Sequence, residues 1–266
     1  MATPVAIVDL WQTLRMQGRI MHAIMLREVA TRFGRDNASF LWLSGEPLTF
    51  CLGVLLLWHF IKPPFEHGIP VLPFAMSGYL PLIMLRHMTG HSLAAVKANT
   101  GLLYHRQITI LQLFFARLAL EFVGITIAFL TVYMVLFTYG IADPPKKLYL
   151  LLGGWFLMAC TGVWWSLILG ALAQIHEIVE RVIPVLTYIL IPIAGTFFLA
   201  DWVPPAYRHW LLMLPFIHCT EMIRAGIFGN AAHFYYNPPF VLGWALVMTV
   251  IGLLFTRFVR ESVDVD

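Results

Sequence analysis

The sequence predicts an all-α polytopic membrane protein, and three observations support this fold class. Of its 266 residues, 60% are hydrophobic and 12% are charged, whereas a soluble globular domain carries about 25% charged residues. The mean hydropathy is +0.79. Uncharged apolar runs recur along the chain, and they are too long and too continuous for barrel strands, which alternate in segments of about 10 residues.

Six of these runs predict six transmembrane helices. Several of them reach the roughly 18 to 20 apolar residues that a spanning helix needs. The first run is short and reaches a spanning length only if residues 41–43 are included in the same helix. The runs cover residues 47–61, 68–85, 122–142, 148–175, 182–200 and 240–256.

The basic residues predict that both termini are cytoplasmic. With both ends inside, eleven of the 17 lysines and arginines fall in cytoplasmic parts, five fall outside, and Arg117 lies within a span. An excess of basic residues marks the cytoplasmic side of a membrane protein. An even number of spans agrees with this orientation.

Residues 9–35 predict an N-terminal helix that lies along the membrane surface. Apolar residues from Trp11 to Met25 recur three and four apart, with basic residues on a neighbouring stripe, as in interfacial amphipathic helices. A helix that faces the cytoplasm or binds a partner is the alternative. Arg27, Arg32 and Arg35 then precede the first span, where they are expected to contact anionic lipid or a partner.

Several ionisable residues lie at or within the apolar runs. Glu46 is expected at the level of the headgroups or paired with a nearby arginine. Arg117 and Glu121 are one helical turn apart, so they form either a paired belt at the inner interface or a deeper polar surface that faces a cavity. His87 and His91 lie four apart and could share a metal ion, but no third ligand is evident, so hydrogen-bonding histidines are the simpler expectation.

Small residues in the fourth run predict close helix packing. Gly162, Ser166 and Gly170 follow one another at a spacing of four residues. Such a stripe lies on one helical face and lets another helix approach closely.

Residues 201–239, between the fifth and sixth runs, predict a re-entrant helical hairpin on the outer face. Prolines and Gly229 divide this region into two helices of about ten residues, each about 15 Å long or half a bilayer. Non-helical backbone at that depth survives where protein or water covers it. Glu221 and Arg224, at helical spacing, are expected to form a local pair.

The chain lacks the sequence motifs of an ATPase or a hydrolase. No lysine follows a glycine, which excludes the phosphate-binding loop that ends in Gly-Lys-Ser/Thr. The segment from His176 to Glu180 lacks the second histidine of the HExxH zinc helix, and no GxSxG nucleophile motif occurs. We therefore expect a transport subunit rather than an enzyme.

Three segments closely resemble the permease subunits of ABC exporters for capsular polysaccharide, the group 2 type of Gram-negative bacteria. They are REVATRFGRDNASFLWLSGEP, AAVKANTGLLYHRQITILQLFFARLALE and LPFIHCTEMIRAGIFG. The likeness covers nearly the whole chain in order and spacing, and the middle segment, residues 94–121, is the most specific. Related permeases for O-antigen or teichoic acid share the architecture, so the class of transporter is better defined than its substrate.

The resemblance implies one transmembrane domain, residues 1–266, in the bacterial inner membrane. Two copies would pair, and each would bind a separate ATPase that holds ATP and Mg²⁺, so no cofactor is expected on this chain. Membrane lipids, a periplasmic adaptor and an outer-membrane polysaccharide exporter are further expected partners, and nucleic acid is not. A coupling helix is expected within residues 93–105, with a second contact in 27–35. The coupling residues implied are Leu93, Val96, Lys97, Asn99, Leu102, Tyr104, His105, Arg27, Arg32 and Phe33.

The transport path would be the crevice between two copies. A long acidic polymer needs aromatic faces for its sugar rings and a few positive charges for its carboxylates, with none that bind strongly enough to trap it. Export of another glycan, such as O-antigen or teichoic acid, is the near alternative, and an integral membrane transferase is one of a different class. The candidate path residues are Arg117, Glu121, Trp58, Phe74, Tyr79, Phe197 and Phe198.

Overall fold

A computed structural model of the chain describes residues 4–33, 39–93 and 108–263. Within these residues the fold is α-helical, apart from a 3-10 turn and one antiparallel ribbon of two short strands, β1 (Phe65–Glu66) and β2 (Ile69–Pro70). The prediction of an all-α protein is therefore confirmed. The helices are α1 (Pro4–Phe33), α2 (Ser39–Ile61), α3 (Val71–Leu93), α5 (Ile110–Thr138), α6 (Leu148–Ile175), α7 (Glu177–Ile193), α8 (Pro205–Leu211), α9 (Pro215–Phe228) and α10 (Pro238–Val263).

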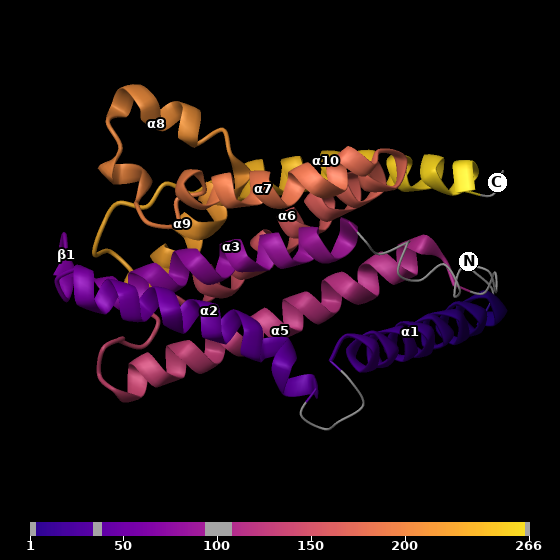
Figure 1. Ribbon diagram of the computed structural model, residues 1–266, viewed down its shortest axis with the longest axis horizontal. Helices are drawn as coiled ribbons and strands as arrows, with labels where there is room; N and C mark the ends of the chain where they lie inside the picture. The colour runs from indigo at the N-terminus through magenta and orange to yellow at the C-terminus, as the bar shows by residue number, and fades with distance from the viewer. Residues whose placement is uncertain (1–3, 34–38, 94–107, 264–266) are drawn as a thin grey trace.

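The long helices run side by side along the length of the molecule (Figure 1). The two ends of the chain and α1 lie at one end of this bundle. The β-ribbon and α8 lie at the other end. Helix α3 ends, and α5 begins, toward the end that holds the termini.

Four helices in the described part of the chain are long and apolar enough to cross a membrane. They include most of α2, all of α5 and α6, and the greater part of α10. The helices α8 and α9 are bent by 106° and together form a broken span or a re-entrant loop. The other two predicted runs fall on α3, whose last turns hold Arg86, His87 and His91, and on α7, which has 17 residues. The fold is thus polytopic and helical, and the count of six spans stays a prediction.

Helix α5 starts with a capping box. The Thr109 hydroxyl accepts a hydrogen bond from the Gln112 backbone N–H, and the Gln112 side chain accepts one from the Thr109 N–H at 2.8 Å. This reciprocal arrangement satisfies two backbone donors that would otherwise lack partners. With 29 residues, α5 is about 44 Å long and exceeds the hydrocarbon core of about 30 Å. Its first turns can therefore present charged side chains near one membrane surface.

Helix α6 occupies the centre of the bundle, where it packs against α3, α9 and α10. The predicted small-residue stripe faces α3 and the start of α5. A Cβ atom added to Gly162 would overlap the Met88 sulfur, and one on Gly170 would lie 2.6 Å from the Phe114 ring. Ser166 between them is fully buried. The prediction of close packing along this stripe is confirmed.

The predicted hairpin region contains helices of unequal length and no Glu221–Arg224 ion pair. Helix α8 has 7 residues and none is buried, whereas α9 has 14 and is buried almost throughout. Arg224 is fully buried and donates to the carbonyl oxygens of Gly195 and Thr196, both at 2.6 Å. Glu221 accepts from the backbone N–H groups of Ala200 and Tyr235, each at 3.0 Å. The prediction of a local pair was wrong because the backbone beyond α7 offers groups that lack helical partners.

Candidate functional site

Helix α1 is attached to the bundle through α5 and α2. Ile24 of α1 is buried in a small apolar cluster with Leu113 and Phe114 of α5. Near its middle, the Gln17 side chain accepts a hydrogen bond from the Gln112 side chain at the start of α5. These contacts bring the last turns of α1 alongside the charged first half of α5.

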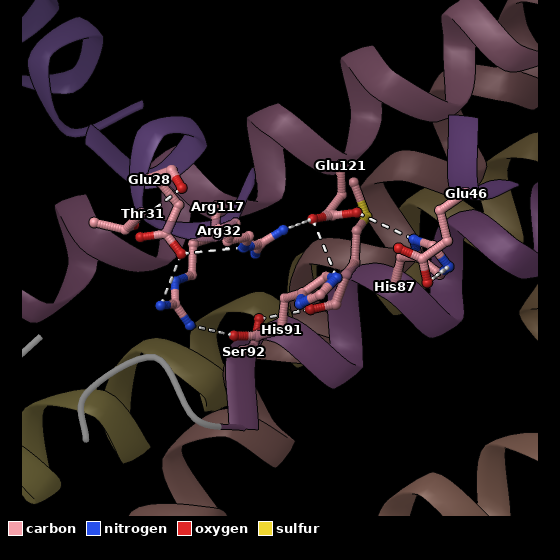
Figure 2. Close-up of polar contacts among 10 residues, drawn as sticks. Glu28, Thr31, Arg32, Glu46, His87, His91, Ser92, Arg117 and Glu121 are labelled. Carbon is pink, nitrogen blue, oxygen red and sulfur yellow. Dashed lines mark hydrogen bonds and ion pairs between the residues drawn. The ribbon is translucent and has the colours of Figure 1, made fainter. Parts of the chain in front are cut away.

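Two pairs of opposite charges face each other across α1 and α5 (Figure 2). Glu28 and Arg32 are one helical turn apart on α1, and Arg117 and Glu121 are one turn apart on α5. Arg117 Nη2 lies 2.8 Å from Glu28 Oε1, and Arg32 Nη1 lies 2.5 Å from Glu121 Oε1. Arg32 Nε also contacts Glu28 Oε1 at 3.2 Å. The charges along α1, acid then base, are thus complementary to those along α5, base then acid.

Helix α3 contributes two histidines to the same cluster. His87 Nδ1 lies 3.2 Å from Glu121 Oε2, and His91 Nε2 lies 3.4 Å from Glu121 Oε1. Arg117 Nη1 donates to the His91 backbone carbonyl at 2.7 Å. Glu46 of α2 approaches the other ring nitrogen of His87, with Oε1 at 4.0 Å from Nε2. We call these six residues, Glu28, Arg32, His87, His91, Arg117 and Glu121, the charged cluster.

The charges at the centre of the cluster are buried. Glu28, Arg117 and Glu121 have exposed fractions of 4%, 6% and 2%. A buried charge costs several kcal/mol unless it is paired and hydrogen-bonded. Each carboxylate here meets a guanidinium, so the pairs hold only while α1 and α5 stay together. The cluster therefore links the position of α1 to that of α3 and α5.

The structure places the predicted charged residues with partners that the sequence did not indicate. Arg117 and Glu121 pair with α1 and α3 and not with each other, so the paired belt was wrong. Among the described residues, the ionisable side chain that contacts Glu46 is His87, and Arg35 lies outside the described part of the chain. Glu121 is the third possible ligand beside the two histidines. The sequence did not indicate this residue as a ligand, because it lies 34 positions from His87. The role of Glu28 was also missed, although it stands one helical turn before Arg32.

The predicted aromatic path residues lie mainly toward the other end of the molecule. The rings of Trp58 and Phe197 are 5.1 Å apart, and Phe74 lies under the guanidinium of Arg224 at 3.9 Å. Phe74 and Tyr79 are covered within this chain, with exposed fractions of 3% and 8%. Phe198 is half-buried and provides a carbonyl oxygen for Arg224. The structure brings several of these aromatics together but separates them from Arg117 and Glu121.

Few of the predicted coupling residues are described. Leu93 is buried with Leu169 and Ile183, and Arg27 is exposed on α1. Arg32 belongs to the charged cluster. The remaining residues fall outside the described side chains: Val96, Lys97, Asn99, Leu102, Tyr104, His105 and the side chain of Phe33. Their role in coupling stays a prediction.

Comparison with known proteins finds relatives that match nearly the full chain. The capsule polysaccharide export inner-membrane protein CtrC of Neisseria meningitidis serogroup A is 36% identical over 253 residues, which are 95% of this chain and 96% of the relative. The capsule polysaccharide export inner-membrane protein BexB of Haemophilus influenzae is 34% identical over the same shares of the two chains.

A more distant relative carries a related name. The polysialic acid transport protein KpsM of Escherichia coli is 24% identical over 242 residues, or 91% of this chain and 94% of the relative.

No protein-family model matches the chain. The likeness to CtrC and BexB extends from end to end at more than 30% identity. The chain therefore belongs to the family of capsule polysaccharide export inner-membrane proteins.

Proposed function

We propose that this chain is the permease subunit of an ABC exporter that moves capsular polysaccharide across the inner membrane. The observation that carries the proposal is the end-to-end likeness to two named capsule export proteins. The apolar helices provide the membrane part of such an exporter. Because the sequence lacks a phosphate-binding loop, ATP hydrolysis is assigned to a separate ATPase subunit. The polymer is expected to carry a lipid anchor.

Two copies of the chain would form the transporter. Helices α2 and α10 support this arrangement, because they are the least buried of the candidate spans, with 28% and 22% of their apolar windows covered. Their exposed apolar side chains would face either lipid or the second copy. In the full assembly α3 and α7 would complete six spans, since both pack within the bundle against α6. The polymer would pass between the two copies.

The end of the molecule that holds both termini is assigned to the cytoplasm. The basic residues favour this side, and α3 ends and α5 begins toward this end of the molecule (Figure 1). With this orientation, we propose that residues 93–105 bind the cytoplasmic ATPase. A periplasmic adaptor and an outer-membrane exporter would act at the opposite end, which holds the β-ribbon and α8.

The charged cluster would carry motion from the ATPase into the membrane. His91 stands two residues before the end of α3, next to the proposed coupling segment. Arg117 and Glu121 lie in the first half of α5, just after that segment. A push on the segment would therefore act on α3 and α5 together, and the ion pairs to Glu28 and Arg32 would make α1 move with them.

Co-purification with the candidate ATPase tests the proposal. The unsubstituted chain should bind the ATPase and stimulate its hydrolysis of ATP. Lys97→Glu and Tyr104→Ala should weaken both, whereas Lys62→Glu, at the end assigned to the periplasm, should change neither. A chain that binds no ATPase in any condition contradicts the proposal. Glycan transfer by the purified chain without an ATPase would instead identify a transferase.

A further inference from the structure

Three metal-ligating side chains come together between the last turns of α3 and the first half of α5: those of His87, His91 and Glu121 (Figure 2). One nitrogen from each histidine and one oxygen of the carboxylate all lie within 4.8 Å of one another. Among the described residues, no other set of three or more histidine, cysteine and acidic side chains comes this close. This group lies inside the charged cluster, where Glu121 contacts both histidines and also Arg32.

We propose that His87, His91 and Glu121 form a binding site for a divalent transition metal ion such as Zn²⁺. Imidazole and carboxylate ligands suit this class of ion. Two histidines four residues apart on one helix face can bind a single zinc ion. A third ligand from a neighbouring helix and a water molecule then complete four-coordination.

The three ligand atoms are close enough to form a tetrahedral site after side-chain rotation. Metal bonds of about 2.0–2.1 Å place neighbouring ligand atoms about 3.3–3.4 Å apart in a tetrahedron. The His87 Nδ1–Glu121 Oε2 distance is 3.2 Å and fits this value, whereas His91 Nε2 lies 3.4 Å from the other carboxylate oxygen, Oε1, and would have to turn toward Oε2. The two imidazoles would need to draw together by rotation of their rings. Glu46, near His87 Nε2, can orient that ring from outside, as carboxylates do beside metal-bound histidines.

The charges around the site can accommodate a cation. Three carboxylates, those of Glu28, Glu46 and Glu121, meet two guanidiniums, those of Arg32 and Arg117, so the group carries a charge of −1 with neutral imidazoles. A divalent ion would change this to +1. The Arg32 contact is to Glu121 Oε1, which leaves Oε2 for the ion. The side chains of His91 and Glu46 are 36% and 43% exposed, so ion and water have access.

A metal ion here would join α3 directly to α5 beside the segment that separates them in sequence. Both helices would then be held by a bond stronger than the present hydrogen bonds. The assignment of the site rests on the three side chains and not on the proposed transport function. Its test is therefore a binding measurement that requires neither ATPase nor polymer.

The experiment is a Zn²⁺ titration of the purified chain, without a polyhistidine tag, in detergent after treatment with a chelator. A chromophoric chelator competes for the ion and reports its affinity. We expect one tight site per chain, weakened more than about tenfold by His87→Asn and by His91→Asn. The matched controls are His209→Asn and His233→Asn, two exposed histidines far from the cluster, which should leave the affinity unchanged.

X-ray absorption of the zinc-loaded chain gives an independent measurement. Two imidazoles among ligands at about 2.0–2.1 Å are expected. Glu121→Gln should also weaken binding, but it removes a buried charge and could disturb the fold. His91→Asn replaces a partly exposed side chain, so it serves as the variant that keeps the fold. Absence of stoichiometric binding, or binding that His87→Asn and His91→Asn leave unchanged, would overturn the proposal and leave the two histidines as hydrogen-bonding partners of Glu121.

Discussion

At the scale of single residues, the ion pair between Glu28 and Arg117 is the contact on which α1 most depends. Both side chains are almost fully buried, and the guanidinium also holds the His91 carbonyl. Removal of one member of such a pair leaves an unpaired buried charge, which costs more than the pair contributes. We therefore expect this ion pair to determine how firmly α1 is held against α5.

Arg117→Ala should lower the free energy of unfolding of the purified chain by about 3–5 kcal/mol, because Glu28 would remain buried without its partner. Unfolding by denaturant in detergent measures this. The control is Arg181→Ala, an exposed arginine on α7, which should change stability by less than about 0.5 kcal/mol. Equal stability of the two variants contradicts the buried-pair account. Normal stability with lost export would instead support a role of Arg117 in the transport path.

Gly78 and Gly90 of α3 offer a second comparison at this scale. A Cβ atom on Gly78 would overlap the Thr196 carbonyl oxygen and the Arg224 guanidinium, whereas one on Gly90 would meet nothing within 4 Å. Gly78→Ala should therefore destabilise the protein by about 1–3 kcal/mol. Gly90→Ala should raise stability by about 0.5–1 kcal/mol, because alanine favours the helix. Thermal unfolding of both variants measures the difference, and a loss in Gly90→Ala equal to that in Gly78→Ala contradicts the packing described.

At the scale of elements, α1 and α5 recognise each other through the order of their charges. Acid then base along α1 meets base then acid along α5. If the two charges of one ion pair are exchanged between the helices, α1 should stay docked, whereas a single substitution within the pair should release it.

Glu28→Arg alone should place two guanidiniums against each other and release α1, which hydrogen exchange of the α1 amides would detect as faster exchange. The double variant Glu28→Arg with Arg117→Glu should restore much of the protection, since the opposite charges again face each other. If the single and double variants exchange alike, α1 is held by its apolar contacts around Ile24 and not by the ion pairs.

The sequence predicts elements well and contacts between them poorly. An uncharged apolar run of about 20 residues has the length of a helix that crosses a bilayer, so α2, α5, α6 and α10 could be predicted from the sequence. The partners of Arg117 and Glu121 could not be predicted, because Arg32 and Glu121 stand 89 positions apart and meet only when α1 packs on α5. The local Glu221–Arg224 pair failed for a similar reason, since unpaired backbone groups after α7 bind both side chains.

At the scale of the whole molecule, orientation in the membrane can be measured by labelling of single cysteines in intact cells. Asp143→Cys and Asn230→Cys, exposed at the end assigned to the periplasm, should react with a membrane-impermeant maleimide. His176→Cys, in the turn between α6 and α7, should react after lysis only. The unsubstituted chain is the control for its own three cysteines: Cys51 and Cys219 are buried, and Cys160 is half-buried within α6. The reverse pattern would place the termini in the periplasm.

The whole molecule combines apolar helices long enough to cross a membrane with a charged cluster at the end proposed to meet the ATPase, and its sequence has no phosphate-binding loop that ends in Gly-Lys-Ser/Thr. In the proposed function, two copies of the chain and two ATPase subunits together carry out transport across the inner membrane. Each of these parts can be supplied separately in a reconstituted system.

The most direct test is transport of labelled capsular polysaccharide in liposomes that contain the purified chain and its candidate ATPase. With ATP added outside, where the ATPase faces, the polymer should accumulate in the lumen, protected from an added glycan-degrading enzyme. It should not do so without the ATPase, without ATP, or with Lys97→Glu. Polymer that stays outside although the complex is assembled and hydrolyses ATP would contradict the account of this chain as a polysaccharide export permease.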